Sequence, residues 1–63
     1  MNQFKKARLL AGMDQKELAQ KLGVTNVTVS KWENGEMLPK AKRLKEVAAV
    51  LNTTIGELLN EGG

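Results

Sequence analysis

The sequence contains no cysteine and no histidine, and Ser30 is its only serine. Without cysteine, neither a disulfide framework nor a thiolate zinc site can form. Without histidine there is no imidazole to act as a general base, to activate Ser30 or to bind a metal. These absences exclude most catalytic and metal-binding chemistry. We therefore expect a protein that is not an enzyme and that uses neither a metal nor a cofactor.

Long hydrophobic runs are also absent. The longest is Val47–Leu51, five residues, whereas a membrane-spanning helix needs about 20 apolar residues. A chain of 63 residues has room for one small domain. We expect a single domain over residues 1–63, located in the cytoplasm, with no membrane partner and no evident small-molecule ligand.

The charge is positive and unevenly distributed. The chain has ten Lys and Arg residues and seven Asp and Glu residues, which gives a net charge of +3. Residues 1–45 carry all ten cations and four of the acids, a balance of +6, and residues 46–63 carry the other three acids, a balance of −3. A basic body with an acidic end indicates a polyanionic partner, although ordinary surface lysines would give the same total.

The apolar residues recur at spacings of three and four throughout, as in helices, and no stretch alternates as a strand would. In the first segment, for example, the apolar positions are Phe4, Ala7 and Leu10 or Ala11. Capping residues bound each segment: Asp14, Thr25 and Thr54 are N-cap types, and glycine or asparagine follows the helix ends. The pattern predicts helices over 2–11, 15–22, 26–34 and 40–51, and a short one after Thr54. The fold class is therefore all-α.

The second and third predicted helices form a helix-turn-helix over about residues 15–34. Ala19 must be small because the third helix crosses close to it, and Gly23 permits the sharp turn between the two helices. Apolar residues fix the angle between the helices: Leu18, Leu22, Val24, Val29 and Trp32. Trp32 could stack on a base, but its spacing from Val29 places it in the core.

The run AGMDQKELAQKLGVTNVTVSKWENG, continued by LKEVAAVLNTTIGELL, resembles the phage repressor/Cro-like (XRE-type) helix-turn-helix family from about Phe4 to Leu59. The resemblance implies a compact five-helix, lambda-repressor-like domain of a prokaryote or phage. It implies a sequence-specific transcriptional regulator, usually a repressor, whose third helix enters the major groove of double-stranded DNA, commonly as a homodimer. An antitoxin or a bridging protein-interaction module on the same scaffold stays open as the alternative.

The resemblance assigns base contacts to Asn26, Val27 and Lys31. Their chemistry is compatible with this role, since asparagine pairs with adenine, lysine donates to guanine, and valine packs on a thymine methyl. Val27 could instead pack against the preceding helix. The resemblance also implies phosphate contacts from Gln15, Thr28, Ser30 and Asn34, and a helix N-terminus such as that at Gln15 suits an anion independently. The bland alternative for these residues is capping and solvation.

The start of the fourth helix gives an argument from charge alone. Lys40, Lys42 and Arg43 lie in its first turn, where the macrodipole disfavours cations. A DNA phosphate at that helix end would reverse the penalty, so we predict phosphate contacts from all three. A poorly capped, solvated helix start is the alternative.

Two further groups are assigned by the resemblance. Arg8 and Glu33 match a family ion pair that links the first helix to the end of the third, where it fixes geometry more than it adds stability. Because the family often dimerises through its last helix, Ile55, Leu58 and Leu59 are candidates for a dimer surface; the alternative is that they are fully used in the core.

Overall fold

The computed structural model describes residues 3–59 of the chain, and within that range it contains five helices and no strand. The helices are α1 (Gln3–Leu10), α2 (Gln15–Leu22), α3 (Asn26–Glu33), α4 (Ala41–Val50) and α5 (Ile55–Leu59). The predicted all-α, five-helix class is confirmed. The expected helix start at Asn2 lies outside the described residues. No helix in the described range is both long and apolar enough to cross a membrane.

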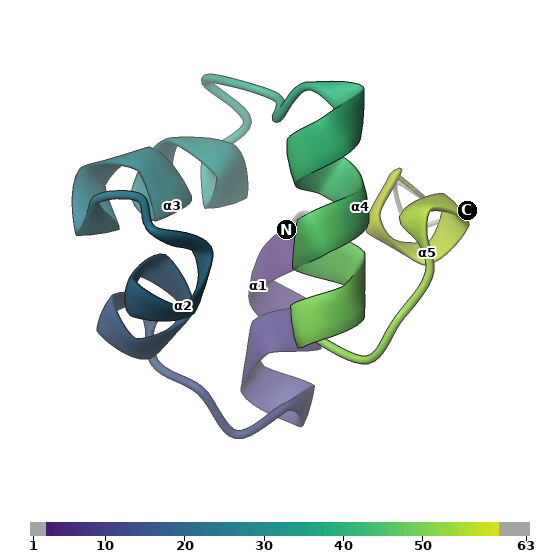
Figure 1. Ribbon diagram of the computed structural model, residues 1–63, viewed down its shortest axis with the longest axis horizontal. Helices are drawn as coiled ribbons and strands as arrows, with labels where there is room; N and C mark the ends of the chain where they lie inside the picture. The colour runs from purple at the N-terminus through teal and green to yellow at the C-terminus, as the bar shows by residue number, and fades with distance from the viewer. Residues whose placement is uncertain (1–2, 60–63) are drawn as a thin grey trace.

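The helices pack around a centre formed by α1 and α4. In Figure 1, α2 and α3 lie on one side of these two helices, and α5 lies on the other. Helix α2 packs against both α3 and α4, while α1 packs against α3 and α5. The predicted helix-turn-helix therefore forms one flank of the molecule, and α2 is the element that joins it to α4.

The turn between α2 and α3 forms as the local sequence predicts. Asp14 accepts a hydrogen bond from the Glu17 amide at 2.8 Å, and the Asp14 amide donates to the Glu17 carboxylate at 3.3 Å, which completes a capping box at the start of α2. Gly23 ends α2 in the left-handed region, at φ 70°, where glycine avoids a Cβ clash. Thr25 then caps α3 by accepting from the Thr28 amide at 3.2 Å.

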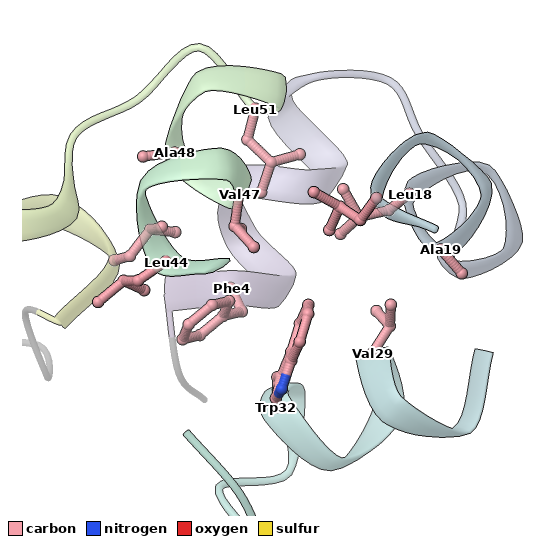
Figure 2. Close-up of a cluster of buried hydrophobic side chains, with 11 residues drawn as sticks. Phe4, Leu18, Ala19, Val29, Trp32, Leu44, Val47, Ala48 and Leu51 are labelled. Atoms are coloured by element: carbon pink, nitrogen blue, oxygen red, sulfur yellow. The ribbon is translucent and has the colours of Figure 1, made fainter. Parts of the chain in front are cut away.

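A single apolar core holds the helices together. Val29 and Val47 are completely buried, and the Trp32 ring lies with its centroid 6.2 Å from that of Phe4. Figure 2 shows side chains from α1, α2, α3 and α4 directed toward a common centre. The interior position of Trp32 confirms the core interpretation. The buried apolar residues among those described are Phe4, Leu18, Ala19, Leu22, Val29, Trp32, Leu44, Val47, Ala48, Leu51 and Leu58.

The exposure of three apolar positions bears on the sequence-based expectations. Leu58 is only 3% exposed, so it belongs to the core and is unavailable for the dimer surface proposed for it. Leu59 is 44% exposed and Leu10 is 80% exposed. Leu10 is the last residue of α1, and its apolar spacing does not lead to burial, whereas the exposure of Leu59 keeps it available for the expected dimer surface.

Candidate nucleic-acid interface

The outward face of α3 is exposed. Asn26, Val27 and Lys31 are all exposed, whereas Val29 and Trp32 on the opposite face are buried. Val27 is 63% exposed, so it does not pack against α2, which was the alternative for this residue. A large exposed apolar side chain between two hydrogen-bonding side chains matches what a surface that reads base edges needs.

At each end of α3, polar side chains form a hydrogen bond with a neighbouring side chain. The Thr28 hydroxyl lies 3.0 Å from the Thr25 hydroxyl at the helix start. At the helix end, the side-chain amide of Asn34 donates to the Ser30 hydroxyl at 3.4 Å. These contacts hold the side chains along the rim of the exposed face, where each oxygen or amide keeps further hydrogen-bonding capacity for an external group.

A buried polar network joins the first three helices. The Arg8 Nε donates to Glu33 Oε2 at 2.6 Å, and its Nη1 donates to the Met13 carbonyl at 2.9 Å. The Arg8 and Glu33 side chains are only 8% and 4% exposed. The hydrogen bond to Glu33 raises the pKa of Arg8, against the opposing effect of burial. The structure thus contains the ion pair that the family resemblance implies.

Gln15 belongs to the same network, which the sequence did not predict. Its Nε2 donates to Glu33 Oε1 at 3.1 Å, so the first residue of α2 is tied to the end of α3. An amide nitrogen carries two hydrogens. One therefore serves Glu33, and the other is available at the N-terminal end of α2, the end that favours an anion.

The start of α4 carries two exposed basic residues. Lys40 is the N-cap residue but makes no capping hydrogen bond, and both Lys40 and Lys42 are exposed. A surface groove of about 570 Å³ has Thr28 of α3 and these two lysines among its lining residues. One side of α3, at Thr28, and the basic start of α4 therefore line one groove.

Arg43 differs from its two basic neighbours. Its Nη1 donates to the carbonyl of Leu22, the last residue of α2, at 2.7 Å. The same atom lies 3.3 Å from Glu46 Oε1. The sequence grouped Arg43 with Lys40 and Lys42 as a phosphate contact, whereas the structure gives its guanidinium partners within the domain. No local sequence signal identifies the Leu22 carbonyl as its acceptor.

An exposed apolar area lies between the loop that follows α3 and the end of α5. Met37, Leu38 and Leu59 are 43%, 62% and 44% exposed. They line a surface hollow of about 360 Å³ together with Phe4 and Trp32. Of the dimer-surface candidates, Leu59 contributes to this area, whereas Ile55 is half-buried against the core and Leu58 is buried.

The comparisons with known proteins agree on one family. The sequence pattern described as helix-turn-helix matches residues 4–58. The chain is 43% identical over 44 residues to the 26 kDa repressor protein of Escherichia phage HK022, covering 70% of this chain and 19% of the relative. It is 38% identical over 48 residues to the HTH-type transcriptional activator BcrR of Enterococcus faecalis, covering 76% and 24%. The chain thus spans less than a quarter of the length of these relatives, and no solved structure matches it significantly.

Proposed function

The chain belongs to the XRE-type helix-turn-helix family, and on that premise we propose that it binds double-stranded DNA as a sequence-specific transcriptional repressor. Family membership also indicates a non-enzymatic regulator. The observation that carries the proposal is the exposed face of α3. Two exposed lysines at the start of α4, Lys40 and Lys42, line a groove that Thr28 of α3 also lines. Repression is proposed because the family resemblance implies a repressor and one of the similar proteins is the phage HK022 repressor.

Helix α3 reads the bases in this proposal. Inserted in the major groove, it presents Asn26 to adenine, Lys31 to guanine O6 and N7, and Val27 to a thymine methyl. The buried network behind α3 supports this role, because Glu33 ties the helix to both Arg8 and Gln15. A recognition helix held by buried contacts on two other helices keeps its orientation when it meets the groove.

Phosphate contacts place the domain on the duplex. Gln15 offers its second amide hydrogen at the start of α2, and Lys40 and Lys42 bring positive charge to the start of α4. The residues along the rim of the exposed α3 face supply further hydrogen bonds to the sugar-phosphate backbone of the DNA. Such contacts carry no sequence information, but they fix register and supply the salt-dependent part of the affinity. The rim residues are Thr28, Ser30 and Asn34.

Replacing Lys42 by methionine is expected to weaken binding to every duplex by a similar factor. Each phosphate neutralised contributes about 0.9 to the slope of log K against log salt concentration, so the magnitude of that slope should fall by about 0.9. Fluorescence anisotropy of labelled duplexes at several salt concentrations measures this. The matched control is Lys45→Met, an exposed lysine of the same helix that should leave the slope unchanged. If the wild-type chain binds no duplex even at low salt, the DNA proposal is wrong and the protein-interaction alternative gains.

A homodimer provides the second half-site. Half-sites of such regulators lie about 34–36 Å apart, whereas the longest dimension of this domain is 29 Å, so one protomer does not span both. We propose that Met37, Leu38 and Leu59 form the dimer surface, because they are exposed apolar residues around one hollow. This set replaces the original one that included the buried Leu58.

Leu59→Glu is expected to prevent dimerisation without unfolding the domain, because this leucine is 44% exposed and lines the hollow but not the groove beside Lys40 and Lys42, and a charge at an apolar contact is costly to bury. Titration of duplexes that carry one or two half-sites should then show independent binding to each half-site, with the cooperativity between the two half-sites lost. Leu10→Glu is the control, since Leu10 is 80% exposed on α1 and does not line that hollow. Unchanged cooperativity for Leu59→Glu would exclude this surface.

A further inference from the structure

The positive charge of Arg43 is unfavourable in the first turn of α4 and favourable beside the last turn of α2. In the first turn of α4, a cation opposes the positive end of the helix dipole. The guanidinium reaches across to the Leu22 carbonyl, which belongs to the last turn of α2, where carbonyl groups lack intrahelical partners and the dipole is negative. The contact with α2 therefore offsets the penalty that α4 imposes on this residue.

This hydrogen bond connects the two halves of the proposed interface. Leu22 immediately precedes Gly23, whose left-handed turn leads into α3. Among the described residues, the Arg43–Leu22 contact is the only side-chain hydrogen bond between α4 and the helix-turn-helix. Glu46, at 3.3 Å from the same guanidinium, orients it from one turn further along α4.

We infer that Arg43 is a positioning residue of the DNA interface. Its bond to the Leu22 carbonyl holds Lys40 and Lys42 at a fixed place relative to the base-reading face of α3. The inference rests on the proposed DNA-binding function, and it assigns Arg43 a role through other residues in place of direct phosphate contact. The base contacts of α3 and the phosphate contacts of the two lysines must fit one rigid duplex. Because this bond fixes their relative positions before binding, it lowers the free-energy cost of aligning them.

The salt dependence of DNA binding separates a positioning role from a phosphate contact. The main variant is Arg43→Met/Glu46→Gln, which removes the guanidinium and keeps the net charge. We expect it to weaken duplex binding about tenfold, or about 1.4 kcal/mol, at every salt concentration, with the slope of log K against log salt unchanged. Lys42→Met should instead lower the slope. Arg43→Lys should restore part of the affinity, since an ammonium group still donates to the Leu22 carbonyl.

A double-mutant cycle distinguishes positioning from a general effect on stability. If Arg43 places Lys42, then Lys42→Met should cost less than half as much affinity in the Arg43→Met/Glu46→Gln background as in the wild type. Circular dichroism at the binding temperature verifies that each variant is folded. A role in stability alone predicts equal costs in the two backgrounds.

Two outcomes would overturn the inference while the wild type still binds DNA. A slope lowered as much by the charge-balanced Arg43 variant as by Lys42→Met would make Arg43 a direct phosphate contact. Unchanged affinity in that variant would show that the bond positions nothing. Failure of the wild-type chain to bind any duplex would instead refute the proposed function itself, so the two failures are distinguishable.

Discussion

Replacing Glu33 by glutamine is expected to lower the free energy of unfolding by about 3–5 kcal/mol, because it leaves the buried guanidinium of Arg8 without its counter-charge. The Arg8 side chain is 8% exposed, and its Nε donates to Glu33 at 2.6 Å. A domain of this size has a total stability of only about 3–9 kcal/mol. The variant should therefore be marginally folded or unfolded near room temperature.

Urea denaturation followed by Trp32 fluorescence measures this effect, since Trp32 is the only tryptophan and is 3% exposed when folded. Glu36→Gln is the matched control: the same chemical change three residues later, at an exposed loop position, should alter stability by no more than about 0.5 kcal/mol. Equal stabilities for the two variants would show that the buried ion pair is not needed to hold α1 against α3.

The second large effect concerns sequence discrimination. The double variant Asn26→Ala/Lys31→Met should lose about 2–6 kcal/mol of preference for the best duplex over random duplex, because each base contact contributes about 1–3 kcal/mol. Affinity for random duplex should fall much less, since the proposed phosphate contacts are intact. Competition binding against unlabelled random duplex measures the ratio.

The control for that experiment is the stability of the double variant. Asn26 and Lys31 are both exposed, so the double variant should keep its unfolding free energy within about 0.5 kcal/mol per substitution. A loss of affinity that is equal for the best and the random duplex would contradict base reading by α3. It would reduce the role of both residues to general attraction for DNA.

Local structure could be predicted well from the sequence because its causes are local. The capping box of Asp14 and Glu17, the left-handed Gly23 and the N-cap Thr25 each depend on residues within a few positions. Helical spacing also identified the inward side of α3, with Val29 and Trp32 buried. The five helices and most of the core follow from these features.

Contacts between distant residues could not be predicted in the same way. Helical spacing places Leu58 and Leu59 on one apolar side of a short helix, but only the position of α5 against α1 and α4 decides that Leu58 alone is buried. The charge of Arg43 indicated an anionic partner, and the acceptor proved to be a carbonyl 21 residues earlier. Such a choice depends on how the helices pack, which spacing does not encode.

Selection of bound duplexes from a random-sequence pool tests the central claim, that α3 reads the bases of double-stranded DNA, most directly. The account predicts one enriched sequence with two inverted half-sites about 34–36 Å apart, and loss of that enrichment when Asn26→Ala/Lys31→Met is selected in parallel. A pool that is retained by the wild-type protein but shows no enriched sequence would contradict it, because binding would then depend on phosphates alone.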